Sequence, residues 1–154
     1  MDTSYNTNIF EIAKWFLNKE SMSHKKLQKL CYYALSWYYA LYNAELVHDF
    51  EFEAWVHGPV SSDLYQIYRI YKLDIPKSSE PPKFDKDLNN YLNRVYERYG
   101  HMDGDELEEL THSEEPWKKA RGNLPKNVSS KNKLDKTCIK EYYKKTVNKL
   151  EGKN

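Results

Sequence analysis

One stretch of the chain decides the fold: Phe52-Glu53-Ala54-Trp55-Val56-His57-Gly58-Pro59-Val60. An apolar residue stands at every second position from Phe50 to Val56, and a period of two predicts a strand with one buried face. We expect Gly58-Pro59 to end this strand, and Leu46-Val47 to supply its hairpin partner across a turn at His48-Asp49. A lone hairpin is marginally stable in water, so this one must pack against helices.

The remainder of the chain has the periodicity of amphipathic helices, with apolar residues three or four positions apart. Asn, Ser and Asp residues precede several of these segments and are predicted to cap them. The expected fold is therefore α+β and mainly α-helical, with about six or seven helices around a small β-hairpin. The predicted helices begin near Ile9, His24, Ser61 or Ser62, Asp85, Asp103, Pro116 and Asp135, and the stretches 74–83 and 122–134 are predicted loops.

Length and composition bound the architecture. A chain of 154 residues, 40% of them hydrophobic, fits one domain over residues 1–154 that can bury a core without covalent staples. Cys31 and Cys138 both fall on apolar stripes, which predicts two buried thiols and no disulfide, as in a reducing compartment. No apolar run approaches the roughly 18 residues of a membrane span, and no apolar leader precedes the first helix. We therefore expect a cytoplasmic protein without a membrane partner.

The net charge of +1 hides two blocks of opposite sign. Residues 101–116 contain seven acidic side chains and no Lys or Arg, whereas residues 117–154 contain twelve Lys or Arg and three acidic side chains. These blocks can be solvated helix faces or patches for partners of opposite charge, and both interpretations stay open. The basic block also suggests nucleic-acid binding, but Tyr142 and Tyr143 lie on the apolar stripe of their helix, so we do not expect a nucleic-acid partner.

A second informative stretch is Leu110-Thr111-His112-Ser113-Glu114-Glu115-Pro116-Trp117-Lys118-Lys119-Ala120-Arg121. Pro116 suits the first turn of a short helix. We expect Trp117 to dock in the core and Arg121 to pair with a carboxylate, Glu53 or Glu115, and so to clamp two elements together. Alternatively, Trp117 and Arg121 form a partner-binding hot spot, since both residue types are enriched at interface centres.

The histidines of these two stretches have a structural and a catalytic interpretation. A structural His57 would hold the turn at Gly58-Pro59 to a carbonyl or cap a helix, and a structural His112 would suit the C-terminus of its helix. The catalytic alternative pairs both with Glu53 or Glu115 as acid and base. The chain has no Gly-rich phosphate loop, nucleophile elbow or zinc-ligand spacing, so we expect no catalytic residue, no metal and no cofactor.

Partner contacts are expected at exposed side chains that combine apolar area with a polar or charged end. The candidates are Tyr5, Trp15, Tyr65, Lys144 and Lys145. The two lysines would meet an acidic surface of a partner.

Several short motifs follow one another in a specific order: Lys26-Leu27-Gln28-Lys29-Leu30-Cys31-Tyr32-Tyr33-Ala34, Trp37, Glu53-Ala54-Trp55-Val56-His57-Gly58-Pro59-Val60, Leu64-Tyr65, Tyr99-Gly100, Leu107-Glu108-Glu109-Leu110-Thr111-His112, Glu115-Pro116-Trp117 and Ala120-Arg121. In this order they resemble the Panacea domain, also called the SocA-like antitoxin domain, of phage-associated proteins. The resemblance covers roughly residues 24–150. The positions that carry it, as structural or partner-binding residues, are Trp55, His57, Gly58, Pro59, Thr111, His112, Pro116, Trp117 and Arg121.

The resemblance implies an antitoxin that neutralises a cognate toxin protein by binding it directly. Toxins paired with this domain are diverse, and one branch of the family delivers its toxin to a bacterial protease, so a protease is a further partner that the resemblance allows. Fewer than ten residues precede the first predicted helix, so we do not expect an added DNA-binding segment or autoregulation of an operon. The alternative is a phage or mobile-element protein of the same fold that binds a host factor or acts as a proteolytic adaptor.

Overall fold

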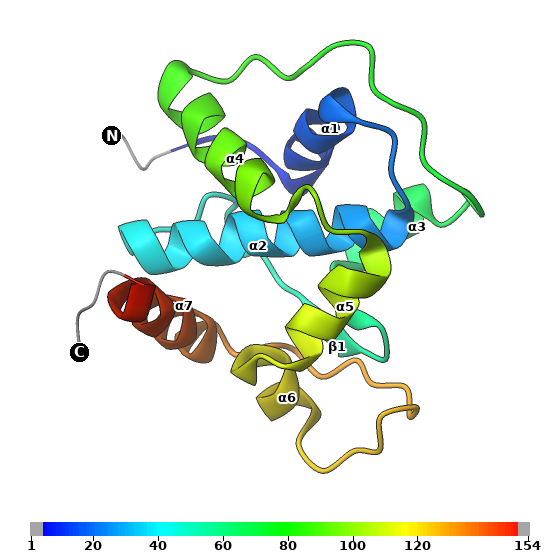
Figure 1. Ribbon diagram of the computed structural model, residues 1–154, viewed down its shortest axis with the longest axis vertical. Coiled ribbons are helices and arrows are strands. Elements are labelled where there is room, and N and C mark those ends of the chain that lie inside the picture. Colours follow the sequence, from blue (N-terminus) through cyan, green and yellow to red (C-terminus); the bar gives the residue numbers. More distant parts are fainter. Residues whose placement is uncertain (1–4, 151–154) are drawn as a thin grey trace.

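The computed structural model describes residues 5–150 and contains, within that range, seven helices and one two-stranded antiparallel sheet (Figure 1). The predicted mainly helical α+β fold with a small hairpin is confirmed. The elements are α1 (Ile9–Lys19), α2 (His24–Tyr42), β1 (Glu53–Trp55), β2 (Gly58–Val60), α3 (Ser62–Tyr68), α4 (Lys86–Tyr99), α5 (Gly104–His112), α6 (Glu115–Arg121) and α7 (Lys136–Leu150).

The long helix α2 is the centre of the molecule. In Figure 1 it crosses the middle of the view, with α1 and α4 above it and α7 below. It packs against α1, α3, α4, α5, α7 and β2, and all but five of its 19 residues are buried. A helix covered on every side must bury polar positions as well as apolar ones, and α2 buries Lys26, Gln28 and Lys29.

Capping residues start the helices where the sequence predicts them. The side chains of Asn8, Ser61 and Asp85 each accept a hydrogen bond from the backbone N–H three residues on. Asp103 and Glu106 form a reciprocal capping box at the start of α5. Each cap satisfies backbone N–H groups that have no partner within their own helix.

The hairpin differs from the prediction. The strand β1 pairs with β2, and the chain reverses at Val56 and His57, so Gly58-Pro59 opens the second strand instead of ending the first. Leu46-Val47 is not the partner: Leu46 is buried in the core, and Val47 forms a single parallel bridge with Thr7. The turn at His48-Asp49 does form. Of the predicted buried face, Phe50, Phe52 and Ala54 are buried, whereas Val56 lies in the turn and is half-buried.

Pro59 is tolerated in β2 because its missing N–H would not have joined the ladder. Its cross-strand partner is Ala54, whose N–H donates to the Asn132 carbonyl and whose C=O accepts from Arg121, both away from β2. The pair is therefore a non-hydrogen-bonded one, the position where proline costs least.

Both edges of this small sheet are covered without a third strand. On the β2 side, the Gln28 side chain donates to the Ser61 carbonyl and accepts from the Ser61 N–H, while Lys29 Nζ donates to the Pro59 carbonyl. On the β1 side, the segment Asn132 to Leu134 runs alongside and bonds to Ala54 and Phe52. The hairpin therefore has its outward backbone groups satisfied from helices and loops.

Three smaller predictions have clear outcomes. Cys31 and Cys138 are buried and free, as predicted. The helix predicted to begin near Ser61 or Ser62 forms as α3, which buries Leu64 and leaves Ile67 exposed. Within residues 5–150 no helix is both long and apolar enough to cross a membrane.

Replacing Gly58 by alanine should be strongly destabilising. Gly58 has φ of +112°, and a Cβ there would lie 2.4 Å from Lys29 Cε and 2.9 Å from Thr111 Oγ1. We expect Gly58→Ala to lower the free energy of unfolding by about 3 kcal/mol, measured by chemical denaturation. Gly122→Ala is the control, because Gly122 also has positive φ but has nothing within 4 Å of the added Cβ; it should cost less than Gly58→Ala, through backbone strain alone. Equal losses would show that the close approach of Lys29 is unimportant.

Candidate functional site

The two informative stretches of the sequence meet in space. Trp117 of α6 is 6% exposed, and its Nε1 donates to the Trp55 carbonyl of β1 at 2.8 Å. The His112 ring stacks on Trp117 at 3.9 Å between centroids. The turn of the hairpin is thereby held against the junction between α5 and α6, and the predicted docking of Trp117 in the core is confirmed.

Arg121 pairs with neither Glu53 nor Glu115, so the prediction of either carboxylate as its partner is wrong. Its guanidinium is buried and donates to four backbone carbonyls, those of Ala54 in β1 and of Pro125, Lys126 and Val128 in the following loop. Glu115 lies six residues earlier on the same helix, about 240° around the axis, which places it on another face. Arg121 ties the loop to the strand by donating to carbonyls of both segments.

His57 lies at the tip of the hairpin and is exposed. Its Nδ1 contacts Glu108 Oε1 at 3.0 Å, and the same carboxylate oxygen accepts from Lys25 Nζ at 2.6 Å. Burial alone would raise the pKa of Glu108, but the hydrogen bonds from Lys25 and His57 bring it below its ordinary value. The expected bond from His57 to a carbonyl is therefore wrong: its partner is a carboxylate of α5.

It is His112 that bonds to the backbone of the turn, at Val56. Burial lowers the pKa of His112, so the ring is kept neutral, and its Nε2 is buried with no hydrogen-bond partner among residues 5–150. Thr111 donates to the Glu108 carbonyl one turn earlier in α5. These contacts give both residues of the Thr111-His112 pair a structural position at the end of α5.

Lys29 is a member of this site that the sequence reasoning missed. It is 1% exposed beneath the hairpin, and its Nζ donates a hydrogen bond to the Pro59 carbonyl at 3.1 Å. Burial lowers the pKa of Lys29 to about 7, although the nearby Glu108 opposes the shift. Periodicity places Lys29 beside a leucine stripe and does not indicate that a hairpin covers it. The available signal was the set of aromatic residues that widen the apolar stripe of α2, because they indicate a helix buried on more than one side.

Glu114 is the second missed member. It precedes α6 and is 8% exposed, and its Oε1 accepts hydrogen bonds from Tyr33 at 2.9 Å and Tyr143 at 2.8 Å. Burial raises the pKa of Glu114 to about 7, against the effect of the two tyrosine hydrogen bonds. The carboxyl therefore joins α2, α6 and α7, although the sequence shows it only as one of seven acidic residues in a charged block.

The acid–base alternative needs different pairings from those that form. His57 pairs with Glu108, Glu53 accepts from the Trp55 indole at 2.7 Å, and Glu115 lies 3.6 Å from Lys119.

A mostly apolar hollow of about 500 Å³ opens beside the turn, lined by 55–57, Val60 and 129–131. Such a hollow suits an apolar side chain of a protein partner.

The predicted partner contacts have different positions. The prediction that Trp15 is exposed is wrong. Trp15 is 4% exposed, and its indole donates to Asn89 of α4. Tyr5 is half-buried, with its hydroxyl on Asp85, and Tyr65 is half-buried between His24 and Trp55. Lys144 and Lys145 are exposed on α7. Whether any of these residues touches a partner remains a prediction.

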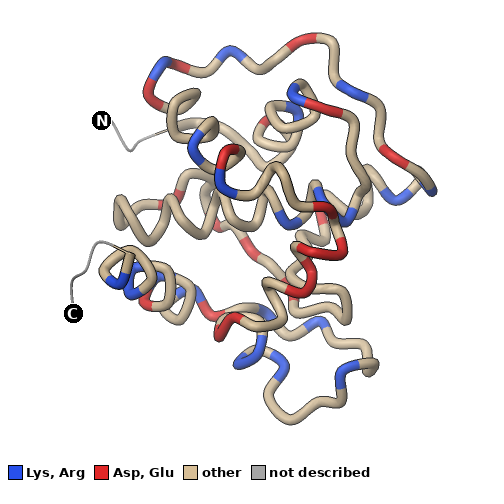
Figure 2. The backbone as a smooth tube through the Cα atoms, viewed as in Figure 1, with Lys and Arg blue, Asp and Glu red and all other residues tan. Residues whose placement is uncertain are grey.

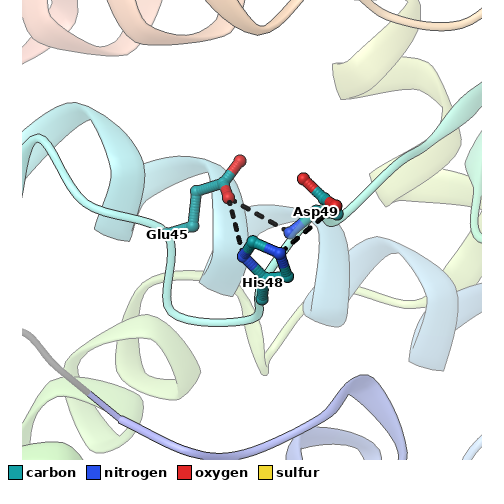
Figure 3. A group of neighbouring side chains, drawn as sticks. All are labelled: Glu45, His48 and Asp49. Atoms are coloured by element: carbon teal, nitrogen blue, oxygen red, sulfur yellow. Dashed lines mark hydrogen bonds and ion pairs between the residues drawn. The ribbon is translucent and has the colours of Figure 1, made fainter.

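Glu45, His48 and Asp49 form a separate cluster whose potential ligand atoms all lie within 4.8 Å of one another (Figure 3). The Glu45 carboxylate accepts a hydrogen bond from the Asp49 N–H and a second from Lys136 of α7. Lys136 already neutralises the Glu45 carboxylate that a bound cation would need. We therefore interpret the cluster as a set of contacts that holds the 45–49 turn to α7.

The protonation of Glu114 should appear in the pH dependence of stability. A carboxyl whose pKa rises from 4.5 to about 7 on folding keeps its proton in the folded state while the unfolded chain releases it. The stabilisation is therefore complete below about pH 4.5 and is lost as pH rises to about 7, with a slope of at most about 1.4 kcal/mol per pH unit. Glu114→Gln, which keeps an acceptor for both tyrosines, should lose this dependence. The exposed Glu115→Gln is the control, and parallel curves for wild type and Glu114→Gln would contradict the assignment.

Lys29 should give a dependence of opposite sign at higher pH. Its pKa falls from 10.5 to about 7 on folding, so between these values the unfolded chain binds the extra proton and wild-type stability rises with pH. Lys29→Met keeps most of the volume without the charge, so the stability difference between the two proteins should change in favour of wild type from pH 7 to pH 10. Urea unfolding at several pH values measures it, with the exposed Lys144→Met as control. A constant difference would show that Lys29 keeps its proton in the fold.

Comparison with known proteins identifies one family. The family described as Antitoxin SocA-like, Panacea domain, matches residues 27–118, which include most of α2, the hairpin, His112 and Trp117. No curated protein and no solved structure matched the chain. Because this match spans well over half of the 154 residues, the chain belongs to the SocA-like Panacea antitoxin domain family.

Proposed function

We propose that this protein is the antitoxin of a toxin–antitoxin pair and neutralises its cognate toxin by direct binding in the cytoplasm. The observation that carries the proposal is the family match over residues 27–118. The family description gives a toxin-related role, and the proposal adds the mode of action, a protein–protein complex.

The surface offers features that suit a protein partner. Figure 2 places acidic residues along α5 and basic residues along α7, so the two charged blocks of the sequence lie on different helices. Oppositely charged patches of this kind steer a partner into one orientation. The apolar hollow beside the hairpin tip supplies a place for a buried anchor side chain.

We further propose that neutralisation needs no catalysis by this chain. The conspicuous titratable groups of the site are engaged in structural contacts: Glu108 with Lys25 and His57, Glu114 with two tyrosines, and Lys29 with a backbone carbonyl. A binding mechanism is stoichiometric, whereas a catalytic one would protect cells at a small fraction of the toxin level.

Co-expression tests the proposal directly. The reading frames that neighbour this gene would be expressed singly from an inducible promoter, with and without this chain. One product should arrest growth alone and be harmless with the chain present, and the two proteins should co-purify in a fixed ratio. Titrating the expression of the chain should restore growth only when it reaches the level of the toxin.

Two results would contradict the proposal. Either no neighbouring product is neutralised, or protection occurs far below stoichiometric amounts without a stable complex. The double charge reversal Lys144→Glu with Lys145→Glu adds a test of the contact surface: unchanged toxin binding would remove the exposed lysines of α7 from it.

A further inference from the structure

A groove beside the C-terminal half of α2, away from the Gln28 and Lys29 side chains that hold the hairpin, has the properties of a docking site. It has a volume of about 580 Å³ and is lined by residues of α2, α4 and α7. Its floor consists of nearly buried side chains, including Trp37, Val95 and Tyr99. Two leucines at its border, Leu41 and Leu150, remain 45% and 64% exposed. An apolar hollow with exposed leucines at its border gains free energy when an apolar surface covers it.

The charge at the groove is partly uncompensated. Arg94 and Arg98 of α4 line it and are exposed, and Arg98 lies over the Trp37 ring at 5.2 Å. Among residues 5–150, neither guanidinium forms an ion pair with a carboxylate: Arg94 bonds to the Tyr42 hydroxyl and Arg98 to the Tyr99 hydroxyl. Glu97 also borders the groove, so the balance is one net positive charge. A partner with acidic side chains beside its apolar face would form ion pairs with these arginines.

The shape of the groove favours a helix. The lining residues of α4 include Tyr91, Arg94, Val95 and Arg98, spaced as one face of two helical turns, about 10 Å along the axis. α2 contributes residues four apart and α7 residues three apart. Ridges of this spacing accept the ridges of another helix.

We propose that this groove docks an acidic amphipathic helix of the partner protein, an inference that rests on the antitoxin function proposed above and assigns it a surface. The partner helix would place apolar residues at i, i+3 or i+4, and i+7 against the groove, with Glu or Asp beside them facing Arg94 and Arg98. A second copy of this chain does not fit this description. Its acidic helix α5 already buries Leu107, and α7 carries lysines that the arginines would repel.

Two synthetic peptides test the chemistry. The first is a stapled helix of about 18 residues with leucines at the positions given above and glutamates beside them; in the second, every Glu is replaced by Lys. Fluorescence anisotropy would measure binding of each to the full chain. We expect the acidic peptide to bind at least about tenfold more tightly than the basic one.

Variants with matched controls locate the binding. Leu41→Asp with Leu150→Asp should weaken binding of the acidic peptide at least about tenfold. Arg94→Glu with Arg98→Glu should reverse the preference in favour of the basic peptide. The controls make the same changes at exposed residues outside the groove, Ile67→Asp with Leu73→Asp and Arg69→Glu with Lys72→Glu, and should keep the wild-type preference. Circular dichroism and thermal unfolding confirm that each variant is folded.

Several outcomes would overturn the groove assignment. These are equal or absent binding of the two peptides, unchanged binding to the folded leucine variant, or a wild-type dimer that the leucine variant converts to monomer. Growth rescue separates this inference from the proposed function. If the leucine variant rescues growth from the toxin as well as its control, the groove assignment fails while the antitoxin function stands. If no toxin is neutralised but the peptide results hold, the antitoxin function fails while the groove remains a binding site for an acidic helix.

Discussion

The architecture depends on how two strands of three residues each can be buried without leaving backbone groups unsatisfied. The helix α2 supplies the answer on one edge, since the Gln28 amide bonds to both backbone groups of Ser61 and Lys29 reaches the Pro59 carbonyl. On the other edge, Arg121 and the segment after it serve β1. Two side chains of a helix thus replace a neighbouring strand. This explains why a Lys and a Gln are buried at the centre of the fold.

Several residues through which the chain resembles its family acquire definite positions from this constraint. Gly58 leaves room for the Lys29 side chain, and Trp117 and Arg121 bond to consecutive carbonyls of β1, those of Trp55 and Ala54. His112 fills the space between Trp117 and the turn. The motif therefore assembles one junction among the hairpin, α5 and α6. The groove beside α4 lies outside this junction.

The sequence predicted well what depends on neighbouring residues and poorly what depends on distant ones. Asn8, Asp85 and Asp103 act within one turn of the chain, so the helix starts were predictable. The hairpin partner was not predictable, because Gly58-Pro59 is typical of a strand end. Only the fold shows that Gln28 and Lys29 bond to the backbone of the second strand and of Ser61 after it. Chemical analogy favours a carboxylate partner for Arg121, whereas its partners are backbone carbonyls of β1 and of the loop that follows α6. Glu114 looked like a surface charge, since periodicity cannot reveal two tyrosine hydroxyls supplied by α2 and α7.

The segment from Asn132 to Leu134 lies beyond residue 118, where the family match ends, yet it covers the outer edge of β1. A fragment limited to the matched residues would leave the N–H of Ala54 and the carbonyl of Phe52 unpaired on an exposed edge, next to two buried phenylalanines. An open apolar edge is a template for pairing with other chains, so such a fragment would tend to aggregate. The last quarter of the chain therefore covers a sheet edge that would otherwise be open to pairing with other chains.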